Sequence, residues 1–184
     1  LLDEPGAPPF HSTKESIRQA IQRMKRQIQF TKDYEALGSQ EPVWQNLDML
    51  FSRLEVPPSV RLELRRMGTE VYADPMLGKV LDNLLDNSLR HGGDHLTEIR
   101  VTGLASDAGF TLTWEDNGVG VPFREKERIF ERGFGKGTGL GLFFAREILE
   151  TTGITIHEAG NPGEGARFLI TIPPGHWRPM PHIP

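Results

Sequence analysis

Glycines alternate with other residues in the second half of the chain, where residues 135–142 read Gly-Lys-Gly-Thr-Gly-Leu-Gly-Leu. Because glycine has no Cβ atom, such a turn lets backbone N–H groups approach an anion closely. A strongly apolar segment, residues 142–149, follows at once and predicts a helix that begins at the turn. A helix N-terminus carries unpaired N–H donors and partial positive charge, so the two features together indicate a phosphate site.

Two common nucleotide-binding patterns do not fit this turn. The dinucleotide fingerprint Gly-x-Gly-x-x-Gly needs a strand directly before it, and no strand signal is present there. The P-loop pattern ends Gly-Lys-Ser/Thr, whereas Lys136 is followed by Gly137. The turn alone therefore leaves the type of site open.

Polar residues that could complete such a site occur in two other places. Residues 116–120 read Asp-Asn-Gly-Val-Gly and follow directly on a predicted strand, which puts a carboxylate at a strand end. A helix over about 74–91 has four polar residues on one stripe beside its apolar face: Asn83, Asn87, Arg90 and His91. Taken singly, Asp-Asn-Gly is also a common turn, and asparagines in a helix are also typical of a solvated face or a tertiary hydrogen bond.

The elements that would position these residues can be predicted from periodicity and turn signals. Helices are predicted at about 12–37, 43–54, 74–91, 123–130 and 139–150. Strands are predicted at about 61–65, 71–73, 99–101, 110–114, 154–156 and 168–172. The Asp74-Pro75 pair is expected to start its helix, with Asp as the cap and Pro at the first helical position. The proline-rich end after residue 173 is expected to be extended or loose.

The first predicted helix has one narrow apolar seam on an otherwise charged and polar surface. Its members are spaced 4-3-4 along the chain: Ile17, Ile21, Met24 and Ile28. This pattern favours contact with a partner helix, as in a bundle or coiled coil, and the alternative is a helix packed on its own domain. Residues 38–42 read Gly-Ser-Gln-Glu-Pro and predict the boundary to a second domain.

Composition limits the classes of protein to which the chain could belong. The sequence has 184 residues, no cysteine and a formal net charge of −4, so thiol chemistry is excluded and nothing indicates nucleic acid as a partner. No apolar run approaches the ~18 residues of a membrane span, so we expect no membrane contact here and a cytoplasmic location. Because the sequence starts with Leu1, we expect it to be a piece of a longer protein, whose parent could be membrane-anchored or cytosolic.

The order of four segments is more specific than any one of them. These segments are the Asn-bearing helix at 83–91, Asp-x-Gly-x-Gly at 116–120, Ile-Phe-Glu-Arg-Gly-Phe at 129–134 and Gly-Thr-Gly-Leu-Gly-Leu at 137–142. In this order they resemble the N, G1, F and G2 boxes of the ATP-binding catalytic domain of sensor histidine kinases. The resemblance covers about residues 43–173, and the helix at 12–37 resembles the second helix of the dimerisation and histidine phosphotransfer hairpin.

The resemblance implies an α+β fold of the Bergerat type, preceded by one long helix. In that two-layer α/β sandwich, a mixed sheet carries helices on one face and ATP lies between helices under a mobile lid. The domains implied are a partial dimerisation and phosphotransfer helix at 1–40, the ATP-binding catalytic domain at 41–175 and a C-terminal tail at 176–184.

The resemblance also implies roles for individual residues. Asn87 would hold Mg²⁺ through its side-chain oxygen, and Asp116 would accept a hydrogen bond from the adenine amine. Gly118 and Gly120 would let the backbone pass close to the base. Arg90 would reach phosphate, and His91, where the family often has Tyr, would pack near the nucleotide. The ATP-binding set is completed by Asn83, Lys136, Gly137, Thr138, Gly139, Leu140, Gly141 and Leu142.

Some positions depart from the family pattern. The lid between Phe134 and Gly137 is very short, and many relatives have threonines where Ala166 and Arg167 stand, which puts one water-mediated adenine contact in question. The phosphate acceptor is expected to lie outside the sequence. His11 is the nearby candidate, but it lacks the acidic and polar residues that follow an acceptor histidine, and it is interpreted as an ordinary exposed side chain.

The function implied is transfer of the ATP γ-phosphoryl group to a histidine and onward to an aspartate of a response-regulator receiver domain. The full-length protein would form a homodimer through its N-terminal hairpin. A dedicated ATPase is disfavoured, because related ATPases have a Glu base where Asn83 stands, and an amide cannot take a proton from water in the same way. Two alternatives remain open: a regulatory module that binds ATP without transferring phosphate, and a serine kinase of the anti-sigma type.

Overall fold

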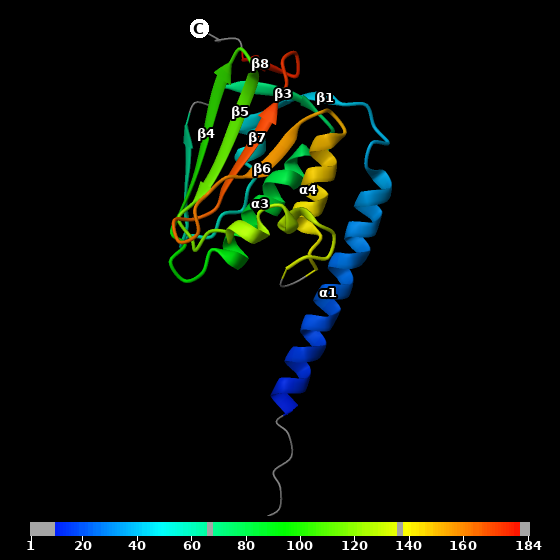
Figure 1. Ribbon diagram of the computed structural model, residues 1–184. Coiled ribbons are helices and arrows are strands. Elements are labelled where there is room, and N and C mark those ends of the chain that lie inside the picture. The colour runs from blue at the N-terminus through cyan, green and yellow to red at the C-terminus, as the bar shows by residue number, and fades with distance from the viewer. Residues whose placement is uncertain (1–9, 66–67, 136–137, 181–184) are drawn as a thin grey trace, which may run out of the picture. The chain divides into compact units, whose positions relative to one another are not determined.

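The computed structural model describes residues 10–65, 68–135 and 138–180 (Figure 1). The chain divides into two compact units, of which the first ends at Ala36 and the second begins at Leu37. The predicted boundary at 38–42 lies just after this division.

The first unit contains a single long helix, α1 (Phe10–Ala36). The four residues of the predicted seam are all exposed: Ile17, Ile21, Met24 and Ile28. Contact with a partner helix stays a prediction. Within the described part of the chain, no helix is both long and apolar enough to cross a membrane.

A five-stranded mixed sheet forms one layer of the second unit. Its strands lie in the order β2 (Arg61–Arg65), β4 (Glu98–Ser106), β5 (Gly109–Asp116), β7 (Arg167–Ile172) and β6 (Thr155–Glu158). The pair β2–β4 is parallel and the other three pairs are antiparallel. Strands β4 and β5, which contain the segments predicted at 99–101 and 110–114, form a β-hairpin in which Ser106 pairs with Gly109 at the turn.

Two helices, α3 (Leu77–His91) and α4 (Gly141–Glu150), form the second layer on one face of this sheet (Figure 1). The core lies between the layers because strand side chains alternate between faces and those on the helix side are apolar. Trp114 and Phe168, paired across β5 and β7, are fully buried there. The predicted apolar face of α3 is likewise buried, from Leu77 to Ser88. The mixed sheet with helices on one face is therefore as predicted.

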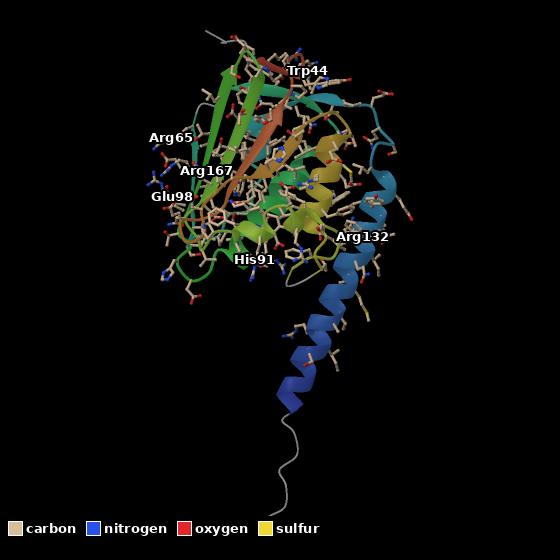
Figure 2. The ribbon with its side chains drawn as sticks, viewed as in Figure 1. Trp44, Arg65, His91, Glu98, Arg132 and Arg167 are labelled. Atoms are coloured by element: carbon tan, nitrogen blue, oxygen red, sulfur yellow. The ribbon has the colours of Figure 1, made fainter. Side chains whose placement is uncertain are left out.

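The other face of the sheet carries charged side chains, of which Figure 2 marks Arg65, Glu98 and Arg167, together with threonines of β4, β5 and β7. They form ion pairs across the strands, such as that between Arg167 and Glu115 at 2.6 Å. A hydrogen bond from the Arg65 side chain lowers the pKa of the Glu63 carboxyl. This face is typical of a solvated sheet surface.

The prediction of a helix over 43–54 is wrong in its first part. Residues Val43–Asn46 form strand β1, and only Leu47–Phe51 is helical, as α2. Val and Trp favour strands, and β1 pairs antiparallel with β3 (Thr69–Ala73). The side chain of Asn46 then accepts a hydrogen bond from the Met49 N–H and starts α2.

A second small sheet contains these two strands and a third, in the order β1-β3-β8. Strand β8 (Trp177–Pro179) belongs to the segment predicted to be an extended or loose tail. It is extended, but the sequence did not predict its pairing with β3. The guanidinium of Arg178 lies 4.2 Å from the ring of Trp44 and adds to the link between the two ends of this unit.

Two helix predictions differ from the structure in detail. Helix α3 begins at Leu77, and Asp74 instead closes the preceding turn by accepting from the Met76 N–H at 2.8 Å. The single helix predicted at 123–130 is replaced by two 3₁₀ turns, η1 (Phe123–Glu125) and η2 (Arg128–Phe130). Lys126 lies between these turns, and its side chain forms an ion pair with a buried partner.

That partner is Glu158 on β6, whose side chain is completely buried. Its Oε2 accepts from the Lys126 ammonium, and its Oε1 accepts from the N–H groups of Gly160 and Arg167, each at 3.0 Å. Lys126 also donates to the Gly160 carbonyl. The pair therefore ties the η1–η2 segment to the loop between β6 and β7.

We expect Lys126→Met to lower the free energy of unfolding by about 3 kcal/mol, because it leaves the buried Glu158 carboxylate without its cation. Glu131→Gln is the control, since it breaks an exposed pair with Arg128 and should change stability by less than about 0.5 kcal/mol. Urea unfolding measures both. Equal losses in the two variants would contradict a special role for the buried pair.

Candidate functional site

The carboxylate of Asp116 is buried at the end of β5, with 7% of the residue exposed. Its Oδ1 accepts from the N–H groups of Gly118 and Ala166, each at 3.0 Å. Its Oδ2 accepts from the hydroxyl of Ser88 on α3 at 2.7 Å. The predicted strand-end carboxylate is therefore held by three donors from three different segments.

The loop after Asp116 runs unusually close to neighbouring backbone. A Cβ atom on Gly118 would lie 2.5 Å from the Cα of Gly92, and Val119 donates to the Gly92 carbonyl at 3.0 Å. Gly120 has a φ of +71°, and a Cβ there would lie 2.7 Å from the Asn161 carbonyl oxygen. The glycines thus seat this loop between the end of α3 and the β6–β7 loop.

The predicted polar stripe of α3 is partly open to solvent. Asn83 and Asn87 are partly exposed, whereas Arg90 and His91 are exposed, and Figure 2 marks His91 at the end of the helix. The Oδ1 of Asn83 lies 3.3 Å from the position that a Cβ on Gly141 would take, so the stripe adjoins the first residue of α4. Arg90 is paired with Asp86 on its own helix at 2.6 Å.

The glycine-rich turn leads directly into α4, as predicted, although the helix begins at Gly141 rather than 139. The residue before it, Leu140, makes no side-chain cap hydrogen bond, so no side chain at this position takes the N–H groups of the first turn. The Gly133 N–H donates to the Gly139 carbonyl at 2.9 Å, which brings Gly133, just before the glycine-rich turn, next to Gly139 within it. Lys136 and Gly137 lie outside the described residues.

Aromatic residues anchor the start of this turn. Phe130 is 2% exposed, contacts Phe168 edge-to-face at 6.3 Å and has the Arg146 guanidinium of α4 4.0 Å from its ring centroid. Phe134 is covered by Arg128 at 4.5 Å. These contacts hold both rings against neighbouring segments at the start of the turn.

A hollow of about 430 Å³ lies beside a different part of α3. It is lined by Arg53, Glu55, Asp82, Leu85, Asp86 and Leu89. Asp82 and Asp86 each precede an asparagine of the stripe by one residue, so they lie about 100° around the helix from it. Burial raises the pKa of the Asp82 carboxyl, against the opposing charge of Lys79. This hollow shares no residue with the predicted site.

Sequence reasoning missed one member of the site. Ser88 lies on the buried face of α3, and its hydrogen bond to Asp116 was not predicted. The available signal was a hydroxyl at a position where the other buried residues of the helix are Leu and Val. A buried polar side chain needs a partner, and such a residue is therefore a candidate for a site.

Residues 73–176 match the family of histidine kinase-, DNA gyrase B- and HSP90-like ATPases. The chain is similar to the alginate biosynthesis sensor protein KinB of Pseudomonas aeruginosa, with 37% identity over 118 residues, or 61% of this chain and 18% of KinB. It spans about a fifth of the length of the curated relatives that it matches.

Solved structures agree with the fold. The ATP binding domain of PrrB from Mycobacterium tuberculosis is 25% identical, with a TM-score of 0.60 over 73% of this chain and 98% of that one. The histidine kinase ThkA, in a complex with response regulator protein TrrA, has a TM-score of 0.68 over 91% of this chain and 53% of that one. At 21% identity, the likeness to this second structure is one of fold.

We expect Gly118→Ala to destabilise the second unit by about 2 kcal/mol, because its Cβ would overlap the backbone of Gly92. Gly78→Ala is the matched control: it lies in α3, and its Cβ would meet only a Leu50 methyl at 3.6 Å. That change should stabilise by up to about 1 kcal/mol through helix propensity. Denaturant unfolding measures the free energy of unfolding of both variants. A Gly118→Ala variant as stable as wild type would show that the close approach is not required.

Proposed function

Because the chain belongs to the histidine kinase-, DNA gyrase B- and HSP90-like ATPase family, we propose that residues 41–175 bind Mg·ATP and deliver its γ-phosphoryl group to a histidine. The observation that carries the proposal is the buried Asp116 carboxylate. Three of its acceptor positions are filled by protein donors, and an ionised carboxylate has about four. The remaining position suits an N–H donor of a ligand.

Adenine supplies such a donor in its exocyclic amine, whereas guanine presents a carbonyl oxygen at the same place. A carboxylate facing that oxygen would place two hydrogen-bond acceptors against each other, which is unfavourable in a buried site. Asp116 would therefore select adenine. The base would lie beside the loop that contains Gly118 and Gly120, which is held close to neighbouring backbone because a side chain at either position would collide with it.

The phosphates would lie at the other end of the site, against the N-terminus of α4. The side chain of the N-cap residue, Leu140, does not cap this helix, and a helix N-terminus attracts an anion through its partial positive charge and its backbone N–H groups. The residues proposed to meet the triphosphate are Lys136, Gly137, Thr138, Gly139, Leu140, Gly141 and Leu142, with Asn83 beside them. Arg90 would have to exchange its pairing with Asp86 for a phosphate contact. His91, which is exposed, would pack near the nucleotide.

The side chains present fit a magnesium ion bound mainly through the nucleotide. Among the described residues, no group of three His, Asp or Glu side chains could hold a metal on its own. Mg²⁺ keeps several waters and takes few protein ligands, so the Asn87 amide oxygen together with phosphate oxygens is a suitable donor set. When bound there, the ion would neutralise charge on the phosphates.

The reaction proposed is phosphoryl transfer to an imidazole rather than hydrolysis. The bond between the γ-phosphorus and its bridging oxygen breaks, a P–N bond to the histidine forms, and ADP leaves. A neutral imidazole nitrogen already has its lone pair, so positioning and charge neutralisation can suffice. Hydrolysis would need a base near the phosphates, and the α3 residue that adjoins α4 is Asn83, an amide.

The partners proposed follow from the same assignment. Helix α1 would be the second helix of a dimerisation and phosphotransfer hairpin, with its exposed Ile and Met seam in the homodimer contact. The phosphoryl group would then pass to an aspartate of a response-regulator receiver domain, in the cytoplasm. The solved complex of ThkA with response regulator protein TrrA supports this class of partner.

We expect Asn87→Ala to weaken Mg·ATP binding by about tenfold or more, with no change in the binding of ATP in EDTA, because only the metal contact is lost. Titration calorimetry measures both affinities. The control is Asn161→Ala, which removes an exposed side-chain amide that bonds to Glu164 and belongs to no proposed metal contact. Equal Mg·ATP affinity in wild type and Asn87→Ala would show that the metal assignment is wrong.

Radiolabelled γ-phosphate tests the reaction itself. The full-length protein should become labelled from Mg·ATP, and the label should be lost in acid and kept in base, as expected for a phosphorylated imidazole. Asp116→Asn should reduce labelling by about a hundredfold at subsaturating ATP. An acid-stable label would indicate a serine or threonine acceptor, and tight ATP binding without any label would indicate a regulatory module; either result contradicts the histidine kinase proposal.

A further inference from the structure

We infer that Trp114 and Ser88 form a directional hydrogen-bond chain that fixes Asp116 as an acceptor and thereby sets the preference for 6-aminopurines over 6-oxopurines. The inference rests on the proposed function, because it takes Asp116 to be the group that meets the base. It adds two residues that lie behind that carboxylate and that the comparison with relatives does not assign. Ser88 and Trp114 are positioning residues, since they act through Asp116.

The chain of hydrogen bonds connects the core to the site. The indole N–H of Trp114 donates to the Ser88 Oγ at 3.2 Å, and the Ser88 hydroxyl donates to Asp116 Oδ2 at 2.7 Å. The three residues are buried, with 0%, 1% and 7% of Trp114, Ser88 and Asp116 exposed. Water is therefore a poor substitute for any of these partners.

The direction of the chain follows from the chemistry of its members. An indole N–H can only donate, so the Ser88 oxygen must be the acceptor in its bond with Trp114. The single hydroxyl hydrogen of Ser88 is then free to point to Asp116, and an ionised carboxylate can only accept. Turning the hydroxyl toward a ligand would leave the buried Asp116 Oδ2 without its protein donor.

The fixed direction of these hydrogen bonds limits which purine base the site can accept. A serine hydroxyl beside a purine could in general donate to a 6-oxo group and so tolerate guanine or hypoxanthine. Here the hydrogen is committed to Asp116, whose other oxygen is held by the N–H groups of Gly118 and Ala166. The carboxylate therefore keeps one orientation and presents only an acceptor to the ligand. Removal of the Ser88 hydroxyl should weaken this orientation and affect recognition of the base more than binding of the phosphates.

The test compares the dissociation constants of Mg·ATP and Mg·ITP, which differ in the 6-amino and 6-oxo groups. Wild type should bind ATP more tightly. Ser88→Ala should weaken the binding of Mg·ATP by about tenfold and change the binding of Mg·ITP by less than about twofold, so the preference for ATP over ITP falls. Trp114→Phe, which removes the indole N–H, should lower this preference by about threefold.

Thr152→Ala is the control for a general loss of packing. It removes another buried hydroxyl, just beyond the C-terminal end of α4, which donates to the Leu149 carbonyl. The ratio of the Mg·ATP and Mg·ITP dissociation constants of this control should equal that of wild type. If wild type binds ATP but Ser88→Ala leaves the ratio of the ATP and ITP dissociation constants unchanged, the hydrogen-bond chain does not set the preference for the base. An equal change of this ratio in Thr152→Ala would overturn the inference in the same way. Absence of ATP binding by wild type would overturn the proposed function and the inference together.

Discussion

The buried carboxylate of Asp116 is the interaction on which the rest of the site depends. It receives hydrogen bonds from α3 through Ser88, from its own loop through Gly118 and from the start of β7 through Ala166. A carboxylate cannot be buried at low cost without such donors, so all three segments must stay in register with the end of β5. The group proposed to meet the base is thus also a structural link between the helical layer and the sheet.

Two other contacts lie at the base end and at the phosphate end of the proposed site. The approach of Gly118 to Gly92 joins the loop after β5 to the end of α3, and the bond from Gly133 to Gly139 closes the turn before α4. The Lys126–Glu158 pair holds the segment between these two places to the edge of the sheet. In the proposed site the glycine-rich turn does no chemistry by itself; it would position backbone N–H groups beside the α3 stripe.

Motif order and local periodicity were enough to predict most of the fold and to choose the residues proposed for the site. The helix at 77–91, the hairpin and the Asp116 strand end depend on contacts that are local in sequence. Pairings between distant segments were missed: β8 pairs with β3 about a hundred residues earlier, and the same small sheet makes Val43–Asn46 a strand despite its helical spacing. The Ser88–Asp116 bond joins residues 28 apart and depends on how α3 packs on the sheet, which no local pattern encodes.

A crystal structure of this chain with a non-hydrolysable ATP analogue and Mg²⁺ would show whether Asp116 meets the base. We expect the adenine amine within about 3 Å of Asp116 Oδ2, with the Ser88 hydroxyl still bonded to the same oxygen and the triphosphate at the N-terminus of α4. Adenine bound with its amine away from Asp116, or a Ser88 hydroxyl turned to the base, would contradict this expectation.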